Sequence, residues 1–130
     1  MINVAKNVLK IEIPINPVTK KNHSQVVMIH GRPIVLPSKP YQEYEKNCRP
    51  FIPKLKEPIN FPINLKCTYY MQTRRRCDVT NLLQATCDML VKYGVLEDDN
   101  YTIVASVDGT KVFYDKENPR TIIEIEKATE

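Results

Sequence analysis

The sequence predicts one compact α+β domain, residues 1–130, with a mixed, mostly antiparallel sheet and two helices. Three observations support this class. A chain of 130 residues suits one domain of ordinary size. A composition of 42% hydrophobic and 26% charged residues is typical of a globular protein. Several short β-prone runs are interspersed with only two segments of helical spacing, an order that favours an α+β fold.

The N-terminal half is expected to contain a strand, a hairpin and the first helix. Residues 8–15 ("VLKIEIPI") alternate apolar and polar side chains imperfectly, which indicates a strand. After a basic loop, apolar runs on both sides of Gly31 predict a β-hairpin. Ser38 is a suitable N-cap for a helix over residues 38–48, where tyrosines and a cysteine recur at helical intervals. Four prolines make residues 49–62 a stiff connector.

The C-terminal half is expected to contain four strands and the better helix. Residues 63–71 ("INLKCTYYM") have a strongly β-prone composition. Residues 80–93 predict a helix, with Gly94 in the C′ position that needs left-handed backbone. Two strands around a turn at Asp108-Gly109 follow. In residues 120–128 ("RTIIEIEKA") isoleucine alternates with glutamate, which favours a last strand at a sheet edge.

Composition excludes several classes of protein. The longest apolar runs are too short to span a bilayer, and the N-terminus lacks the features of a secretory signal, so we expect a soluble cytoplasmic protein. Four cysteines without a CxxC pair argue against a zinc or thioredoxin-type site and indicate reduced thiols. The net charge of +4 is modest, but its clustering at Lys20-Lys21 and Arg74–Arg76 is informative.

The second helix separates into two faces on a helical wheel. The expected core face consists of Leu82, Leu83, Thr86, Cys87, Met89, Leu90 and Val91. The opposite face consists of Asn81, Gln84, Ala85, Asp88 and Lys92. The polar face therefore lies on the side of the residue that precedes the helix, Asp78.

Acidic residues stand at both ends of this helix. Asp78 alone is explained by a helix N-terminus, and Asp98-Asp99 alone by a solvated turn. A helix–turn–strand unit, however, can return the second cluster to the first. A hard divalent cation would relieve the repulsion, and Mg²⁺ takes oxygen ligands. The three arginines before Asp78 are either a solvated basic loop or a binding site for phosphates.

The ordered series in residues 74–99 resembles the RusA-like family of Holliday junction resolvases, small endonucleases often encoded by phages and prophages. The residues that carry the resemblance are Arg74-Arg75-Arg76, Asp78-Val79-Thr80-Asn81, Gln84, Asp88, Gly94 and Asp98-Asp99. The family pattern has a second aspartate where this chain has Thr80 and a lysine where it has Gln84.

The resemblance implies a set of roles. Asp78 and Asp99, with Asp98 beside them, would be the catalytic carboxylates that hold Mg²⁺, with Mn²⁺ as an alternative. Gln84 would stand in for the catalytic lysine as a neutral donor to phosphate. We add Asp88 as a substitute ligand, because it shares a helix face with Asn81. The residues expected to contact DNA are Arg74, Arg75, Arg76, Lys20, Lys21 and Asn81.

The function that follows is Mg²⁺-dependent resolution of four-way DNA junctions by paired symmetric nicks in recombination and repair. The resemblance implies a homodimer on branched DNA, and neither a membrane nor a small-molecule cofactor is expected. The changes at Thr80 and Gln84 motivate an alternative, a structure-selective binder of branched DNA with weak or lost cleavage. A third reading is a structural or protein-interaction module whose acids are only surface charge.

Overall fold

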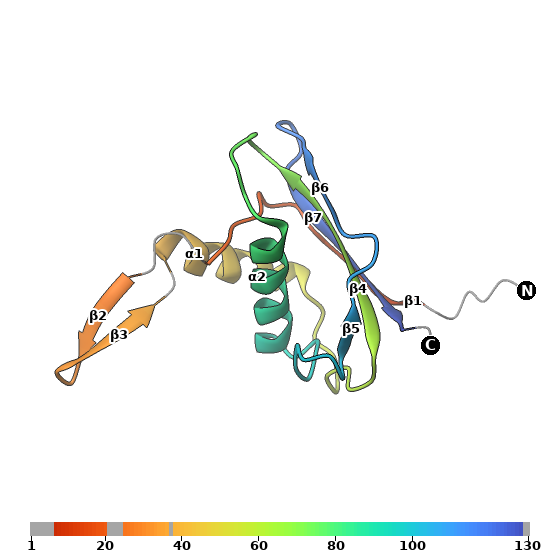
Figure 1. Cartoon of the computed structure of the whole chain (residues 1–130), viewed down its shortest axis with the longest axis horizontal. Coiled ribbons are helices and arrows are strands. Elements are labelled where there is room, and N and C mark those ends of the chain that lie inside the picture. Colours follow the sequence, from red (N-terminus) through yellow and green to blue (C-terminus); the bar gives the residue numbers. More distant parts are fainter. Residues whose placement is uncertain (1–6, 21–24, 37, 129–130) are drawn as a thin grey trace, which may run out of the picture.

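The computed structural model describes residues 7–20, 25–36 and 38–128, and it confirms the predicted α+β class. A twisted sheet has both helices on one side, and a separate hairpin extends away from this body (Figure 1). The strands of the main sheet are β1 (Asn7–Ile13), β4 (Ile63–Met71), β5 (Val104–Ser106), β6 (Lys111–Tyr114) and β7 (Arg120–Lys127).

The main sheet is mixed, with strands in the order β1-β7-β4-β5 and β6 also paired to β4. β7 lies antiparallel to both of its neighbours, whereas β5 and β6 run parallel to β4 at different points along its length. β7 is therefore an interior strand, and the predicted edge position of residues 120–128 is wrong. Its isoleucines alternate with glutamates because one face of the sheet covers the core and the other meets solvent.

Both helices form close to their predicted positions. α1 (Lys39–Cys48) follows Ser38, whose hydroxyl oxygen accepts a hydrogen bond from the backbone N–H of Tyr41, as an N-cap should. A single 3-10 turn, η2 (Arg49–Phe51), comes next. α2 (Val79–Lys92) begins and ends one residue earlier than predicted. No helix in the described part of the chain combines the length and the apolar character needed to cross a membrane.

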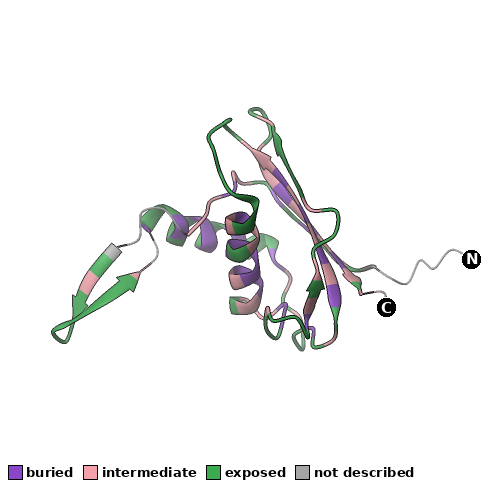
Figure 2. Cartoon of the chain, in the orientation of Figure 1, coloured by how far each residue is buried: buried purple, intermediate pink, exposed green. Residues whose placement is uncertain are grey.

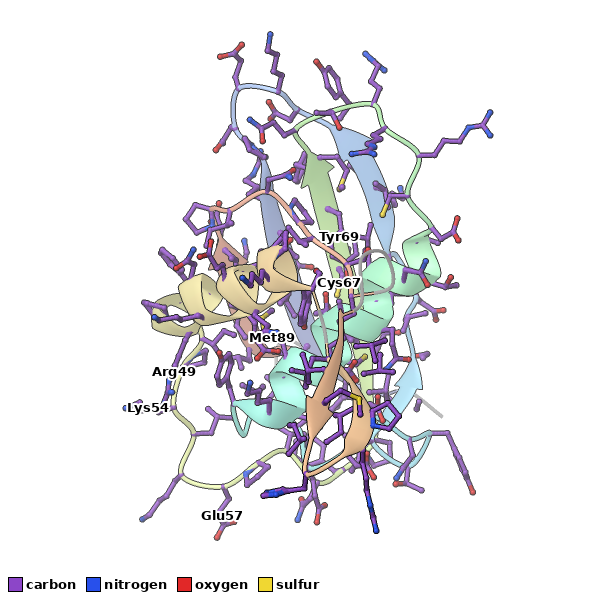
Figure 3. All side chains as sticks on the ribbon, turned by 90° about the vertical axis from the view of Figure 1, so that its left-hand side faces the viewer. Arg49, Lys54, Glu57, Cys67, Tyr69 and Met89 are labelled. Carbon is purple, nitrogen blue, oxygen red and sulfur yellow. The ribbon has the colours of Figure 1, made fainter. Side chains whose placement is uncertain are left out.

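The core lies between the sheet and the helices, where the buried residues of α2 and β4 face each other (Figure 2). Cys67 and Tyr69 of β4 and Met89 of α2 lie near the centre of the molecule, whereas Lys54 and Glu57 of the connector point outward (Figure 3). All four cysteines are free thiols, and three of them are buried.

The buried face of α2 differs slightly from the predicted one. Ala85, which the wheel placed on the polar face, is only 3% exposed. It is buried because Tyr41 of α1 packs there and donates a hydrogen bond to the Ala85 carbonyl oxygen at 3.3 Å. Leu83 and Val91 from the predicted core face are half-buried. The wheel treats a helix in isolation and does not contain the second helix that covers Ala85.

The predicted hairpin is confirmed as β2 (Gln25–Ile29) and β3 (Arg32–Leu36). Its turn residues His30 and Gly31 have φ angles of 51° and 75°. Tight hairpins need positive φ at both positions, because only such turns match the twist of the strands. The hairpin forms a two-stranded sheet of its own.

Gly94 has a φ of 77° just after α2, as the predicted C′ position requires. We expect Gly94→Ala to lower the free energy of unfolding by about 1–2 kcal/mol, the cost of placing a Cβ in left-handed backbone. Steric clash contributes nothing, since no heavy atom lies within 4 Å of the added Cβ. Urea unfolding measures the difference. Gly94→Asn is the control and should lose less, because asparagine tolerates this conformation; equal losses would contradict the conformational cause.

Candidate functional site

The exposed face of α2 carries a hydrogen-bonded group of side chains. Gln84 donates from Nε2 to Asp88 Oδ1 at 2.9 Å and to Asp99 Oδ2 at 3.3 Å. Asp88 lies one helical turn after Gln84, which brings the two side chains together. Asp99 comes from the loop that follows the helix. One amide nitrogen therefore joins two carboxylates from different elements, because the loop brings Asp99 back to the exposed face of α2.

The loop that carries Asp99 is fixed by backbone hydrogen bonds. Val95 donates its N–H to the carbonyl oxygen of Leu90 at 2.8 Å, and its own carbonyl oxygen accepts from Ile59 at 2.9 Å. Glu97 donates to the Ile59 carbonyl oxygen at 3.0 Å. Val95 and Leu96 are buried. The connector and the end of α2 thus hold the acidic loop in place from both sides.

Asp98 shapes this loop. Its Oδ1 accepts the backbone N–H of Asp99 at 2.7 Å, and its Oδ2 accepts the side-chain amide of Asn100 at 3.0 Å. The two carboxylate oxygens thus bond to the two residues that follow. Asp98 also lines the groove described next. Its hydrogen bonds make it a support of the Asp99 backbone.

A groove of about 640 Å³ opens beside these carboxylates, lined in part by Lys20, Tyr41, Asp88, Asp98 and Asp99. Lys20, from the loop after β1, places its Nζ 3.0 Å from Asp88 Oδ2 and 5.4 Å from the centroid of the Tyr41 ring. Burial raises the pKa of the Tyr41 phenol far above its ordinary value, so the ring is neutral. Lys21, the other predicted DNA contact of this loop, lies outside the described residues.

The carboxylates of the groove also affect the pKa of Cys87, a buried residue on the core side of α2. Burial, together with the negative charges of Asp99 and Asp88, raises the pKa of the Cys87 thiol to about 12. Both carboxylates therefore lie close to this one side chain. The thiol stays protonated at neutral pH, so Cys87 fills the core behind the site without adding charge.

Asp78 occupies the N-cap position of α2, but its side chain makes no capping hydrogen bond. Its Oδ2 accepts instead from Asn81 Nδ2 at a long 3.5 Å. Helix capping therefore does not explain this carboxylate. Asp78, Asn81 and Gln84 follow one another at three-residue spacing and line one side of the helix. The neighbouring Thr80 is exposed.

The four predicted metal-binding carboxylates do not form one cluster. Within the described ranges, no group of three or more His, Cys, Asp or Glu side chains could hold a metal ion. Asp78 is separated from Asp88 by ten residues, about 15 Å of helix rise. Asp88 is bonded to Lys20 and Gln84, and Asp98 to its own loop. The structure brings Asp88 and Asp99 together and leaves Asp78 at the start of the helix.

The arginine run lies in the exposed loop between β4 and α2, next to Asp78. The Arg74 guanidinium carbon lies 4.1 Å from the centroid of the Tyr114 ring on β6. None of the three arginines takes part in an ion pair with another described residue. Their charges are therefore available to an external anion.

Sequence reasoning missed two aromatic side chains of this region. Tyr41 faces Lys20 from α1, and Tyr114 faces Arg74 from β6. Each lies at least 21 positions from its cation in the chain, so no local spacing could reveal the pair. Basic side chains over aromatic rings are a common stabilising contact. The helix cap at Ser38 and the β-prone residues 111–114 were the only signals in their neighbourhoods.

The carboxylates beside this groove and the arginines next to Asp78 are the residue types that proteins use on a phosphodiester backbone. A family model described as Endodeoxyribonuclease RusA matches residues 14–126. The chain belongs to the RusA endodeoxyribonuclease family, which confirms the resemblance seen in residues 74–99. No curated relative matches it. Membership in this family supports an activity of cutting DNA internally.

Proposed function

We propose that this protein is a Mg²⁺-dependent endodeoxyribonuclease that resolves four-way junctions by paired symmetric nicks in DNA recombination and repair. The observation that carries the proposal is the pair of Asp88 and Asp99 on one Gln84 amide beside a groove, on the same helix that begins next to the arginine run. Family membership supports the endonuclease activity and the junction substrate.

The donor set fits a cation that needs few protein ligands. Mg²⁺ is commonly bound by one or two carboxylates together with waters and substrate phosphates, so a cluster of three acids is not required. Asp78 and Asp99 would hold the ion, with Asp98 as a further oxygen donor, because Asp88 lies about 15 Å of helix rise from Asp78 and could not share an ion with it. Mn²⁺ prefers similar oxygen ligands. When bound, the ion would stabilise charge on the scissile phosphate and lower the pKa of an attacking water.

The chain's own side chains would position the substrate. Gln84 orients Asp99 and has a neutral donor that can also reach a phosphate oxygen. Asn81 orients Asp78 in the same way. Lys20 reduces the negative charge of the groove through its pair with Asp88, which lowers the repulsion of DNA. Arg74, Arg75 and Arg76 would hold the flanking phosphates, and Lys21 stays a predicted contact of the same kind.

Paired nicks require two active sites. Each chain has one such groove, and a two-fold dimer supplies the second without additional sequence. A homodimer on branched DNA is therefore part of the proposal. We place the protein in the cytoplasm, because four free cysteines suit a reducing compartment.

A second candidate function is the binding of branched DNA without cleavage. It is favoured by the lack of a three-residue metal-binding cluster in the described part of the chain, together with the neutral side chains at Thr80 and Gln84. Arginine–phosphate contacts alone would give strong, salt-sensitive binding. In that case the groove would recognise the shape of the junction and leave its backbone intact.

A junction assay separates the two functions. The protein is incubated with a mobile synthetic four-way junction, or with a linear duplex of the same sequence, in Mg²⁺, in Mn²⁺ or with a chelator. We expect symmetric nicks in the junction, loss of the nicks with chelator, and little cutting of the duplex. Tight binding without nicks in either metal would support the binder, and equal treatment of junction and duplex would contradict both functions.

A further inference from the structure

A second hollow lies at the end of α2, far from the arginine loop. It has a volume of about 420 Å³ and is lined in part by Arg49, Ile52, Pro53, Lys54, Lys92 and Tyr93. We call these six residues the basic pocket. Its Arg49 and Lys54 lie beside each other at one side of the molecule (Figure 3). α2 has 14 residues, so about 21 Å of helix separates the basic pocket from the loop that precedes the helix.

The positive charge of the basic pocket is concentrated and mostly unpaired. Residues 46–56 carry four basic side chains and no acidic one, although the whole chain has a net charge of only +4. Among the described residues, neither Arg49 nor Lys54 takes part in an ion pair. A hydrogen bond to Glu45 raises the pKa of Lys92, but the nearby positive charge of Arg49 opposes that rise. The two cations are close enough to repel each other, and a bound anion would relieve the repulsion.

The same pocket has apolar walls. The Arg49 guanidinium carbon lies 5.4 Å from the centroid of the Tyr93 ring, so the cation lies over an aromatic surface. Ile52 and Pro53 add further apolar lining. Pro50 and Pro53 fix two backbone φ angles, and the Ile52 N–H donates to the Arg49 carbonyl oxygen at 3.1 Å. These constraints form the pocket in advance, which limits the entropy lost when a ligand binds.

A ligand for this pocket must bring negative charge and an apolar group to the same point. A phosphodiester brings charge alone and would leave the apolar walls in contact with water. The last residue of a protein chain carries a carboxylate and a side chain on one Cα atom, so it meets both demands. A guanidinium binds a carboxylate through two parallel hydrogen bonds, and capture of a C-terminal carboxylate is an established mode of peptide recognition.

We propose that the basic pocket binds the C-terminal end of an acidic partner protein. The last side chain of the partner is apolar and enters the hollow against Tyr93, while the terminal carboxylate pairs with Arg49. Acidic residues before it lie near Lys54 and the other cations of residues 46–56.

The position of the pocket places such a partner beside the candidate site. Lys92 lines both the basic pocket and the groove that contains Asp88 and Asp99. A bound peptide would therefore lie at the border of the groove and leave the arginine loop free for DNA. The inference goes beyond the proposed function and does not require it, because a peptide can bind this pocket whether or not the protein cleaves DNA.

Synthetic peptides test the chemistry of the ligand. The probe is four aspartates followed by two phenylalanines, with a free C-terminal carboxylate and a fluorescent label at the N-terminus. We expect the full chain to bind it saturably in a fluorescence anisotropy titration. Amidation of the C-terminus, or serine in place of both phenylalanines, should each weaken binding by about 10-fold or more. Equal affinity for the three peptides would overturn the inference.

Substitutions test the pocket from the side of the protein. Arg49→Gln and Lys54→Gln should each weaken binding of the probe by about 10-fold or more, since each removes a charged hydrogen-bond donor. Arg49→Lys should lose less than Arg49→Gln, because it keeps the charge and loses only the two-pronged contact. Lys116→Gln removes the same charge from the exposed turn between β6 and β7 and should bind like the wild type. Thermal unfolding checks that each variant is folded.

Three further results would overturn the inference: no saturable binding of the probe by the wild type, wild-type affinity in both Arg49→Gln and Lys54→Gln, or an equal loss in Lys116→Gln. Junction affinity of the same variants should stay at the wild-type value. A loss of junction affinity that matches the loss of peptide affinity would assign the pocket to DNA and would also overturn the inference.

Nicking of the junction is measured separately from peptide binding. A protein that binds the probe through the basic pocket but does not nick refutes only the proposed function. A protein that nicks the junction but does not bind the probe refutes only the peptide site.

Discussion

Asp99→Asn is expected to slow junction cleavage by about 100-fold or more, since even the partners of a metal ligand are typically worth 10- to 100-fold. The asparagine carbonyl oxygen can still accept the hydrogen bond from Gln84, so the shape of the site should persist while its charge is lost. Cleavage under single-turnover conditions measures the rate. Junction affinity should stay within a few-fold of the wild type.

The matched control for this substitution is Asp108→Asn. Asp108 is exposed in the turn between β5 and β6, and the Asn64 side chain bonds only to its backbone N–H and carbonyl oxygen. The control should cleave at the wild-type rate. Asp78→Asn should match Asp99→Asn if both carboxylates serve the same ion. A full rate for Asp99→Asn would remove this residue from the mechanism, and a full rate for Asp78→Asn would leave the groove around Asp88 and Asp99 as the whole site.

Replacing Arg74, Arg75 and Arg76 together by glutamine is expected to weaken junction binding strongly and to make the remaining binding less sensitive to salt. Each phosphate contact on duplex DNA contributes about 0.9 to the slope of log K against log salt concentration, so three lost contacts should reduce the slope by about 2 to 3. Fluorescence anisotropy at several salt concentrations gives both quantities. Cleavage at saturating protein should fall much less than affinity, because these side chains position the backbone.

The control for the arginine variant removes the same charge elsewhere. Lys46, Lys54 and Lys56 are exposed on the end of α1 and on the connector, away from the arginine loop. Their replacement by glutamine should leave the salt slope almost unchanged. Equal losses of junction affinity in the two variants would mean that binding responds to net charge alone. The arginine loop would then not be a specific DNA contact.

Local patterns predicted the elements well. Strand β4 was located residue for residue, because nine β-prone residues lie between prolines and a polar run. α2 was shifted by one residue, since Asp78 and Thr80 are both acceptable starts. The errors concern tertiary context. β7 was predicted at an edge because its glutamates are typical of edge strands, but they belong to the solvent face of an interior strand.

Sequence reasoning named the residues of the candidate site but did not predict most of the contacts between them. The return of Asp99 to α2 follows from a helix, a left-handed Gly94 and a turn, all visible in sequence. The pair of Lys20 and Asp88 joins residues 68 positions apart, and no spacing rule reaches that far. The separation of Asp78 from Asp88 was overlooked for a simpler reason: a helical wheel shows direction around the axis and conceals distance along it.

The anchoring of the acidic loop has a consequence for how this chain can vary in evolution. Because Val95 is tied to both Leu90 and Ile59, one inserted or deleted residue before Asp99 would displace its carboxylate by about 3.3–3.6 Å, the reach of one extended residue. Such a shift would break its contact with Gln84. We therefore expect the length of this segment to be held constant among homologues, whereas surface turns elsewhere in the chain can lengthen freely.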